Sequence, residues 1–440
     1  MTTAAQVIKK AASAATPTQK ERESLAGLAS SLLSLTEKAA AKYPEARGAL
    51  LGGSFAKGTW LPGDADLDIF VKIDRSTPKS RFEEIGLAIG REATRGHPRG
   101  KKYAQHPYTE ANVTGTRVNI VPCFDVKEGE WVSAADRSPF HTRLVEGLPE
   151  RAKEQVRVLK LFFKGVGVYG AEIRTRGLSG YVAEVLVIRF GSAEGVLRWF
   201  SRLKIPAEGR AFSLPDPVDE NRDLGTAVSG EKLGLTILGS REFLRAPDIA
   251  FFRHMSPRAR PKVKERVAAL VFSHHPLSED ILWGELRKAN KALVRRLEEG
   301  GFKVARSISA SNNRDRSAFL FVPEFSSLPD VEQRIGPWVD REKDVDAFVL
   351  ANSRKAMMFW VDEDARVRLL RPREETDLDT FLLRLAREGH VDGSNEVTLG
   401  LARTAVLIGG KRLERKAASW KWLKDGIEEV VSDAIGTRRA

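Results

Sequence analysis

Residues 50–74, LLGGSFAKGTWLPGDADLDIFVKID, are the stretch that decides how this 440-residue chain is interpreted. Within it, the apolar run ADLDIFVKI (65–73) predicts a β-strand in which Leu67 and its apolar neighbours point into a core. Residues two apart in a strand lie on one face roughly 7 Å apart, so Asp66 and Asp68 project together. Two such carboxylates repel and raise each other's pKa unless a cation bridges them. The pair therefore predicts a site for Mg²⁺, a hard ion that prefers oxygen ligands and keeps positions open for phosphate.

The loop before this strand is a candidate phosphate site. Gly52, Gly53 and Ser54 free backbone N–H groups at a turn into a helix, and Lys57 adds a positive charge. A nucleoside triphosphate would lie between this loop and the metal ions. The motif is not a P-loop, because Thr59 stands where that motif has its lysine. The alternative interpretation is an ordinary turn followed by a strand end with solvated acids.

The composition favours a polyanionic partner. The chain has 72 Lys and Arg against 59 Asp and Glu, a net charge of +13, which suits nucleic acid because each neutralised phosphate releases counterions.

The single cysteine, Cys123, excludes an internal disulfide and a zinc site of several thiolates, and it fits a reducing compartment. No apolar run approaches the ~20 residues of a membrane span. We therefore expect a cytoplasmic protein with no membrane partner.

Sequence patterns predict three successive parts. In the first, Thr18 and Glu21 form a capping box before an amphipathic helix, and a second helix covers 79–93. The first part also contains the strands GALLGG, ADLDIFVKI, HPYTEANV and TRVNIVPCF, with a helical turn at FAKGTWL. Mixing helices with a mostly antiparallel sheet indicates an α+β domain.

The chain after residue 148 changes character. Pro149 suits the first position of a helix, and YVAEVLVIRF and SAEGVLRWFSRL continue the helical pattern up to a loop at 204–226. A later helix, Ser278–Glu299, precedes strands at 302–310 and 316–323, an α/β stretch at 338–404, and one amphipathic helix with Trp420 and Trp422. We predict a multidomain α+β protein with a head (1–148), a helical neck (149–262), and an α/β body and tail (263–440).

The glycine pair and the D-x-D spacing together match the signature of the nucleotidyltransferase superfamily that includes DNA polymerase beta. Further motifs occur in this order: QHPY (105–108), VPCF (121–124), DRSPFH (136–141), VYGAE (168–172), GLSGYVAE (177–184), DPVDENRD (216–223) and GPWVDREKDV (336–345). With these motifs the chain resembles an archaeal, class I CCA-adding enzyme, a tRNA nucleotidyltransferase, from head to tail.

The resemblance implies an activity and its residues. It implies addition of C, C and A to tRNA 3′ ends from CTP and ATP, with release of pyrophosphate and two Mg²⁺ ions on Asp66 and Asp68. The nucleotide-binding residues would be Gly53, Ser54, Lys57, His141, Lys160, Tyr169 and Arg222, the last reading the base edge. The later domains would clamp the acceptor stem and T arm of tRNA by shape, and the family often forms homodimers. Outside their motifs, Lys160, Tyr169 and His141 would be ordinary surface or packing residues.

The sequence departs from the family pattern at three positions. Asp66 takes a place often held by Glu, and Lys57 replaces an Arg, which keeps the charge but loses bidentate geometry. Asn119 stands where the family has its third catalytic Asp. An amide ligates Mg²⁺ poorly and cannot accept a proton from the primer's 3′-hydroxyl, a loss of roughly 10²- to 10⁴-fold in rate. Asp125 is not expected to replace it, because it lies past Pro122 on no obvious shared face.

Asn119 leaves several interpretations open. The residue is either an engineered replacement that traps substrates or a natural divergence toward a feeble or altered activity. One alternative function is a catalytically silent tRNA-binding homologue. Another is a poly(A)-type nucleotidyltransferase, which would not stop after three nucleotides.

Overall fold

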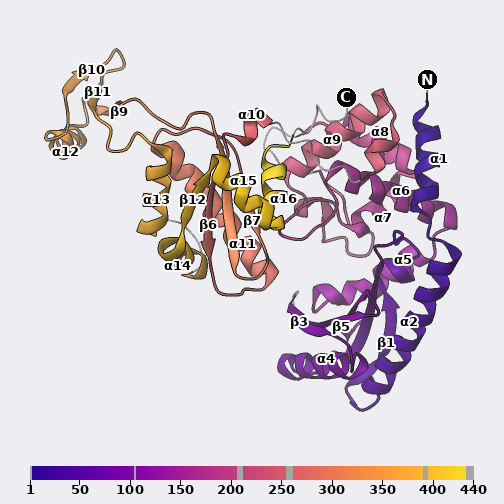
Figure 1. The fold of residues 1–440 in the computed structure, drawn as a ribbon. Coiled ribbons are helices and arrows are strands. Elements are labelled where there is room, and N and C mark those ends of the chain that lie inside the picture. The colour runs from indigo at the N-terminus through magenta and orange to yellow at the C-terminus, as the bar shows by residue number, and fades with distance from the viewer. Residues whose placement is uncertain (1, 104–105, 206–211, 254–260, 390–394, 433–440) are drawn as a thin grey trace. The chain divides into compact units, whose positions relative to one another are not determined.

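The computed structural model describes residues 2–103, 106–205, 212–253, 261–389 and 395–432 (Figure 1). The chain forms two compact units, Met1–Met255 and Ser256–Ala440. Gln105 of the QHPY motif and residues 206–211 of the expected loop lie outside the described residues. No described helix combines the length and the apolar character that a membrane crossing requires. The finer division at residues 148 and 262 stays a prediction.

The first unit contains a five-stranded sheet in the order β1-β2-β5-β4-β3. Its strands are β1 (Ala46–Gly52), β2 (Asp66–Asp74), β3 (Arg99–Tyr103), β4 (Pro107–Val113) and β5 (Thr116–Asp125). β2 and β5 are parallel, and the other neighbouring pairs are antiparallel. The predicted α+β class with a mixed, mostly antiparallel sheet is therefore confirmed.

One face of this sheet is covered by helices α2 (Gln19–Ala40) and α4 (Lys79–Ala93) (Figure 1). The predicted capping box starts α2, since the Glu21 N–H donates to Thr18 Oγ1 at 3.2 Å and the Thr18 N–H donates to Glu21 Oε2 at 2.8 Å. The buried layer beneath the helices includes Leu67, Ile69, Phe82, Ile85, Val118 and Ile120. Because side chains alternate along a strand, the neighbours of these residues in β2 and β5 lie on the opposite face.

A helical layer follows the sheet within the first unit. It contains α5 (Ser138–Glu146), α6 (Glu150–Val166), α7 (Gly180–Phe190), α8 (Ala193–Arg202), α9 (Gly230–Arg245), and the 3₁₀ turns η1 (Ala134–Arg137), η2 (Leu224–Ala227) and η3 (Ile249–Phe252). The predicted helices at 181–190 and 192–203 correspond to α7 and α8. Four phenylalanines that are buried in one core hold the layer together: Phe162, Phe163, Phe200 and Phe243.

The structure corrects several local predictions in this unit. Pro149 caps α6 from outside instead of occupying its first position. The helical turn after β1 is α3 (Gly53–Ala56), earlier than FAKGTWL predicted. The alanine-rich N-terminus forms a helix, α1 (Ala4–Ala15), whose Val7 and Ile8 are buried in the same core as α6. Neither α1 nor α9 was predicted from the sequence.

The second unit contains a four-stranded antiparallel sheet in the order β12-β6-β8-β7. Its strands are β6 (Ala268–Ser273), β7 (Val304–Ser311), β8 (Arg316–Pro323) and β12 (Val406–Gly409). One hydrophobic cluster joins the sheet to α11 (Glu279–Glu299), α13 (Leu378–Glu388) and α14 (Asn395–Thr404). A second cluster joins it to α15 (Gly410–Ser419) and α16 (Lys421–Val430), and α10 (Pro261–Lys264) precedes β6. The predicted helix from Ser278 and the strand at 316–323 are confirmed.

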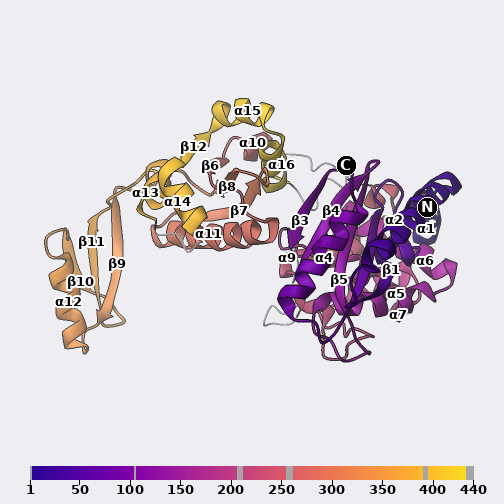
Figure 2. The ribbon, with the colours of Figure 1, turned by 90° about the horizontal axis from the view of Figure 1, so that it is seen from below.

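A smaller sheet in the same unit has the order β10-β11-β9 (Figure 2). Its elements are β9 (Val331–Trp338), β10 (Met358–Val361) and β11 (Arg366–Pro372), with α12 (Glu342–Asn352) contacting β9. The α/β stretch thus begins before residue 338. The prediction of one terminal helix was wrong: Trp420 has extended backbone and separates α15 from α16, which lets its ring stack on Trp422 at 5.7 Å.

Candidate active site

The parallel pairing of β2 and β5 brings the signature acids beside the residue that departs from the family pattern. In this register Asp68 is the partner of Asn119, and Asp66 is the partner of Arg117. All four residues lie on the face opposite the buried layer of α2 and α4, where Leu67 is fully buried. The two acids therefore project from one face, and the fold places position 119 next to them.

Each acid has a basic or amide partner. Arg117 Nε donates to Asp66 Oδ1 at 2.8 Å, and a second Arg117 nitrogen contacts the other carboxylate oxygen. Asn119 Nδ2 donates to Asp68 Oδ1 at 2.9 Å. Burial raises the pKa of Asp68, and the nearby charge of Asp66 adds to this rise, while the hydrogen bond from Asn119 opposes it. Asp68 is thus held where its negative charge lacks a strong counter-charge.

The third side chain of this face has a free acceptor. Asn119 Oδ1 is buried and has no hydrogen-bond partner among the described residues. Two carboxylates and this amide oxygen are hard oxygen donors, the chemistry that a divalent cation such as Mg²⁺ requires. The donors therefore fit such an ion. Among the described residues, however, no group of three or more His, Cys, Asp or Glu side chains is gathered for a metal.

The glycine turn approaches this face at one point. Gly53 has φ +64, and a Cβ there would lie 1.9 Å from Asp68 Oδ2. Glycine suits this position, because the left-handed conformation disfavours a side chain and a Cβ would displace the carboxylate of Asp68. Ser54 follows within α3, so the predicted phosphate loop and the acids are adjacent.

Two of the predicted triphosphate ligands lie in one buried cluster. Lys57 Nζ is 2.8 Å and Lys160 Nζ is 3.4 Å from the two carboxylate oxygens of Glu184 in α7. Lys160 Nζ also donates to the Thr59 carbonyl at 2.9 Å. Burial lowers the pKa of Lys160, and Lys57 adds to this effect. Two ammonium groups thus share one acid, and Lys160 is 2% exposed, not on a solvated helical face.

Tyr169 lies beside this lysine cluster. Its hydroxyl and Lys160 Nζ both approach Gly180, where an added Cβ would lie 3.1 Å from the hydroxyl and 3.3 Å from the ammonium. Lys164 Nζ lies 5.3 Å from the centre of the ring. Burial raises the pKa of Tyr169, which keeps its hydroxyl neutral.

The remaining predicted residues meet at Asp216. His141 Nε2 lies 3.1 Å and Arg222 Nη1 3.3 Å from Asp216 Oδ2, and the Tyr181 hydroxyl donates to Asp216 Oδ1 at 2.7 Å. The rings of His141 and Tyr181 stack at 3.8 Å, and Lys57 Nζ lies 4.9 Å from the Tyr181 ring. Burial lowers the pKa of His141, which favours the neutral imidazole. The base-reading and phosphate-binding candidates are therefore contiguous.

Some residues of this site were missed from the sequence. Glu184, Tyr181 and Asp216 all lie inside quoted motifs, so the motifs held the signal, but the partners of each side chain were not visible. For Arg117 the only signal in the sequence was its position two residues before Asn119, on the same face of the strand. The expectation that Asp125 shares no face with Asn119 was wrong: β5 continues through Pro122, so both lie on one face, but roughly 20 Å apart by strand rise.

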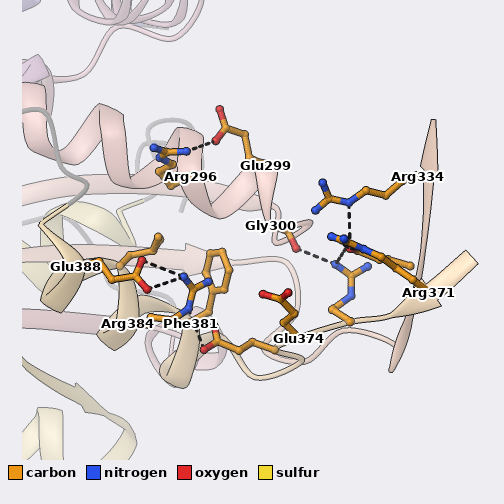
Figure 3. Close-up of a pocket in the computed structure, with 13 residues that line it drawn as sticks. Arg296, Glu299, Gly300, Arg334, Arg371, Glu374, Phe381, Arg384 and Glu388 are labelled. Carbon is orange, nitrogen blue, oxygen red and sulfur yellow. Dashed lines mark hydrogen bonds and ion pairs between the residues drawn. The ribbon is translucent and has the colours of Figure 1, made fainter. Parts of the chain in front are cut away.

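Each unit contains a pocket, and the two pockets differ in the charges that line them. A pocket of about 270 Å³ beside the acids is lined by Asp68, Asn119, Phe70 and Tyr108. In the second unit, a pocket of about 620 Å³ is lined by arginines and glutamates (Figure 3). The figure shows Arg384 directed at Glu388, 3.0 Å away. Its charges are compensated within the pocket, whereas the first pocket adjoins the candidate metal ligands.

Comparisons with known proteins identify the family of the chain. Three family models match successive parts: "Nucleotidyltransferase domain" at 34–144, "tRNA nucleotidyltransferase, second domain" at 154–253, and "CCA-adding enzyme, C-terminal domain" at 265–395. The CCA-adding enzyme of Pyrobaculum neutrophilum is 33% identical over 413 residues, covering 90% of this chain and 97% of that protein. The CCA-adding enzyme of Methanopyrus kandleri is 34% identical, covering 87% of this chain and 86% of that protein.

A solved structure of a cytoplasmic RNA terminal U-transferase aligns with a TM-score of 0.43 and 13% identity, over 57% of this chain and 98% of that one. By its sequence relatives and the three family models, the chain belongs to the archaeal, class I family of CCA-adding enzymes within the nucleotidyltransferase superfamily.

Proposed function

We propose that this chain adds C, C and A to tRNA 3′ ends from CTP and ATP, with release of pyrophosphate, and that Asn119 makes this addition slow. The observation that carries the proposal is the register of β2 and β5, which sets Asp66, Asp68 and Asn119 on one face with Gly53 against Asp68. Family membership supports the reaction class, and the geometry supports these residues as its site.

Asp66 and Asp68 would hold Mg²⁺, with the amide oxygen of Asn119 as a weak third donor. Bound there, two divalent ions supply activation of the primer 3′-hydroxyl and neutralise charge on the leaving pyrophosphate. The protein's own part is to fix these oxygens on a rigid sheet and to exclude a side chain at position 53. Arg117 would have to share Asp66 with the ion.

Lys57 and Lys160 would bind the triphosphate. Their cluster has two ammonium groups for one carboxylate, so an arriving polyanion would relieve repulsion between like charges. Tyr169 lies beside Lys160, and Ser54 lies in the turn that carries Lys57. The network of His141 and Arg222 on Asp216 would present fixed donors to the base edge. Neutral His141 can also serve as an acceptor there.

Asn119 would impair chemistry more than binding. An amide takes no proton from the 3′-hydroxyl, and its oxygen is a weaker ligand than a carboxylate. On this proposal nucleotide affinity depends mainly on the lysine cluster and the glycine turn. The described side-chain hydrogen bond of Asn119 is to Asp68 and reaches neither of them. Binding of CTP and ATP should therefore survive.

An incorporation assay tests the proposal. Labelled CTP and ATP are offered with tRNA that lacks its CCA end, and the chain is compared with Asn119→Asp. We expect the variant to be faster by roughly 10²- to 10⁴-fold, the contribution of a ligand and base. Asp68→Asn is the matched control on the partner strand and should abolish incorporation. No gain with Asn119→Asp would discard the proposed role of this residue.

The same assay separates the alternatives. Extension beyond three nucleotides would identify a poly(A)-type activity. Tight tRNA binding with no incorporation, even after Asp is restored, would identify a silent tRNA-binding homologue. We further propose that the second unit clamps the acceptor stem and T arm of tRNA; nuclease footprints that lie outside those arms would refute this. We also propose that the chain forms a homodimer, which a monomer in sedimentation equilibrium would refute.

A further inference from the structure

Glu110 in β4 lies directly beside the candidate metal ligands. It is the register partner of Asn119 in the antiparallel pair of β4 and β5, and Asn119 is in turn the partner of Asp68. Register partners project to the same face, so the three side chains form one row across three neighbouring strands. Side chains that oppose each other in this way have Cβ atoms about 4.5–5.5 Å apart, within the reach of a glutamate.

This face has too little negative charge without Glu110. Asp66 forms an ion pair with Arg117 and Asn119 is neutral, so of the two signature acids Asp68 is the one that forms no ion pair among the described residues. Divalent ions and a triphosphate together require several anionic oxygens. The row of register partners offers one further carboxylate, and it is adjacent to the residue that lacks a charge.

Glu110 is weakly held in its present position. Its carboxylate lies 3.7 Å from Lys102 Nζ, and the two side chains are 29% and 40% exposed. An exposed pair at this distance contributes little free energy. Rotation about the side-chain bonds of Glu110 can therefore exchange Lys102 for an ion held beside Asn119.

We propose that Glu110 is a metal ligand of this chain and that its carboxylate, turned from Lys102 toward Asn119, replaces the charge that Asn119 lacks. The proposal rests on the proposed function. The acid has moved one strand along the sheet, from β5 to β4, while staying on the same face. Glu110 restores affinity for the ion, but it reaches the site from a different strand on a longer side chain. The slow chemistry attributed to Asn119 therefore remains.

Binding of Mn²⁺ to the full chain, measured by electron paramagnetic resonance without nucleotide or tRNA, tests this inference. We expect Glu110→Gln to weaken Mn²⁺ binding by at least roughly 10- to 100-fold, the loss typical of removing a group that only supports a metal ligand. The matched control is Asp125→Asn, an acid on the same sheet face whose lysine partner is Lys72, and it should leave the affinity unchanged. An equal affinity of Glu110→Gln and the unchanged chain would overturn the proposal.

A double variant identifies the mechanism. In the Glu110→Gln background, Asn119→Asp should restore Mn²⁺ affinity, because the missing carboxylate returns to the neighbouring strand. If the affinity stays low, Glu110 acts by another route and the proposal is wrong. Failure of the proposed function is a separate result: it would show as no incorporation by any variant while Glu110→Gln still weakened Mn²⁺ binding. Unchanged thermal unfolding of Glu110→Gln would show that its effect is local.

Discussion

Replacing Gly53 with alanine separates the strain of the turn from its contact with Asp68. The residue has φ +64, a conformation that costs an L-residue about 1–2 kcal/mol. Its new Cβ would also lie 1.9 Å from Asp68 Oδ2 and 2.8 Å from Asp68 Cγ, so the carboxylate would have to move by about an ångström or more. A misplacement of that size in a reacting group lowers rates by roughly 10²-fold.

Gly63 provides the matched control. It has φ +70, and a Cβ there would meet no atom within 4 Å. Gly63→Ala should therefore lose the same 1–2 kcal/mol or so from backbone strain and leave Asp68 in place. We expect the two variants to unfold at similar urea concentrations.

Incorporation and Mn²⁺ binding should then distinguish them. Gly53→Ala should lose about two orders of magnitude in CCA addition and weaken Mn²⁺ binding, whereas Gly63→Ala should match the unchanged chain in both. The most sensitive background is Asn119→Asp, in which incorporation is fast enough to measure a large fall. Equal incorporation by the two alanine variants would refute the argument that the turn positions Asp68.

Two further predictions concern the buried polar groups. Glu184→Gln would leave two buried ammonium groups facing an amide, so urea unfolding should show a loss of about 3–5 kcal/mol in the free energy of unfolding. The control Glu194→Gln breaks a more exposed pair with Arg198 and should lose less than about 1 kcal/mol. A loss for Glu184→Gln as small as that of the control would contradict the burial argument. Although burial by itself raises it, hydrogen bonds from His141 and Tyr181 hold the pKa of Asp216 at about 2, below its unfolded value of about 3.9. The charged carboxylate therefore stabilises the fold above about pH 4, and this contribution disappears as the pH falls toward 2. The difference in unfolding free energy between the unchanged chain and Asp216→Asn should be largest at neutral pH and shrink between about pH 4 and pH 2, while the exposed control Glu220→Gln should show no such trend; a difference independent of pH would contradict the assignment.

The sequence was sufficient for features that depend on local pattern. The strand with Asp66 and Asp68, the capping box at Thr18 and the helix from Ser278 each follow from spacing within a few residues. Side-chain alternation in β2 also gave the correct face for the two acids, because one short period determines it.

Features that depend on pairing between distant segments were not predictable in the same way. The position of Glu110 opposite Asn119 follows from the register of β4 and β5, and the burial of Lys160 follows from Glu184 in a different helix. Outside its motif Lys160 is expected to be an ordinary surface or packing residue, whereas the structure buries its ammonium group against Glu184 of α7. The amphipathic pattern predicts one helix through Trp420 and Trp422, whereas the extended backbone of Trp420 is visible only in the structure.

The lysine cluster on Glu184 also constrains how the protein accommodates a lengthening primer. Lys57 comes from the turn after β1, while Lys160 and Glu184 come from α6 and α7, so the ion pairs cross from the sheet to the helical layer. Any hinge opening between those layers would separate the buried charged groups from their partners, which is strongly unfavourable. The sheet and the helices should consequently move as one rigid piece. On the proposed function, each newly added nucleotide would then be accommodated by displacement of the RNA terminus past the stationary face that carries Asp66 and Asp68.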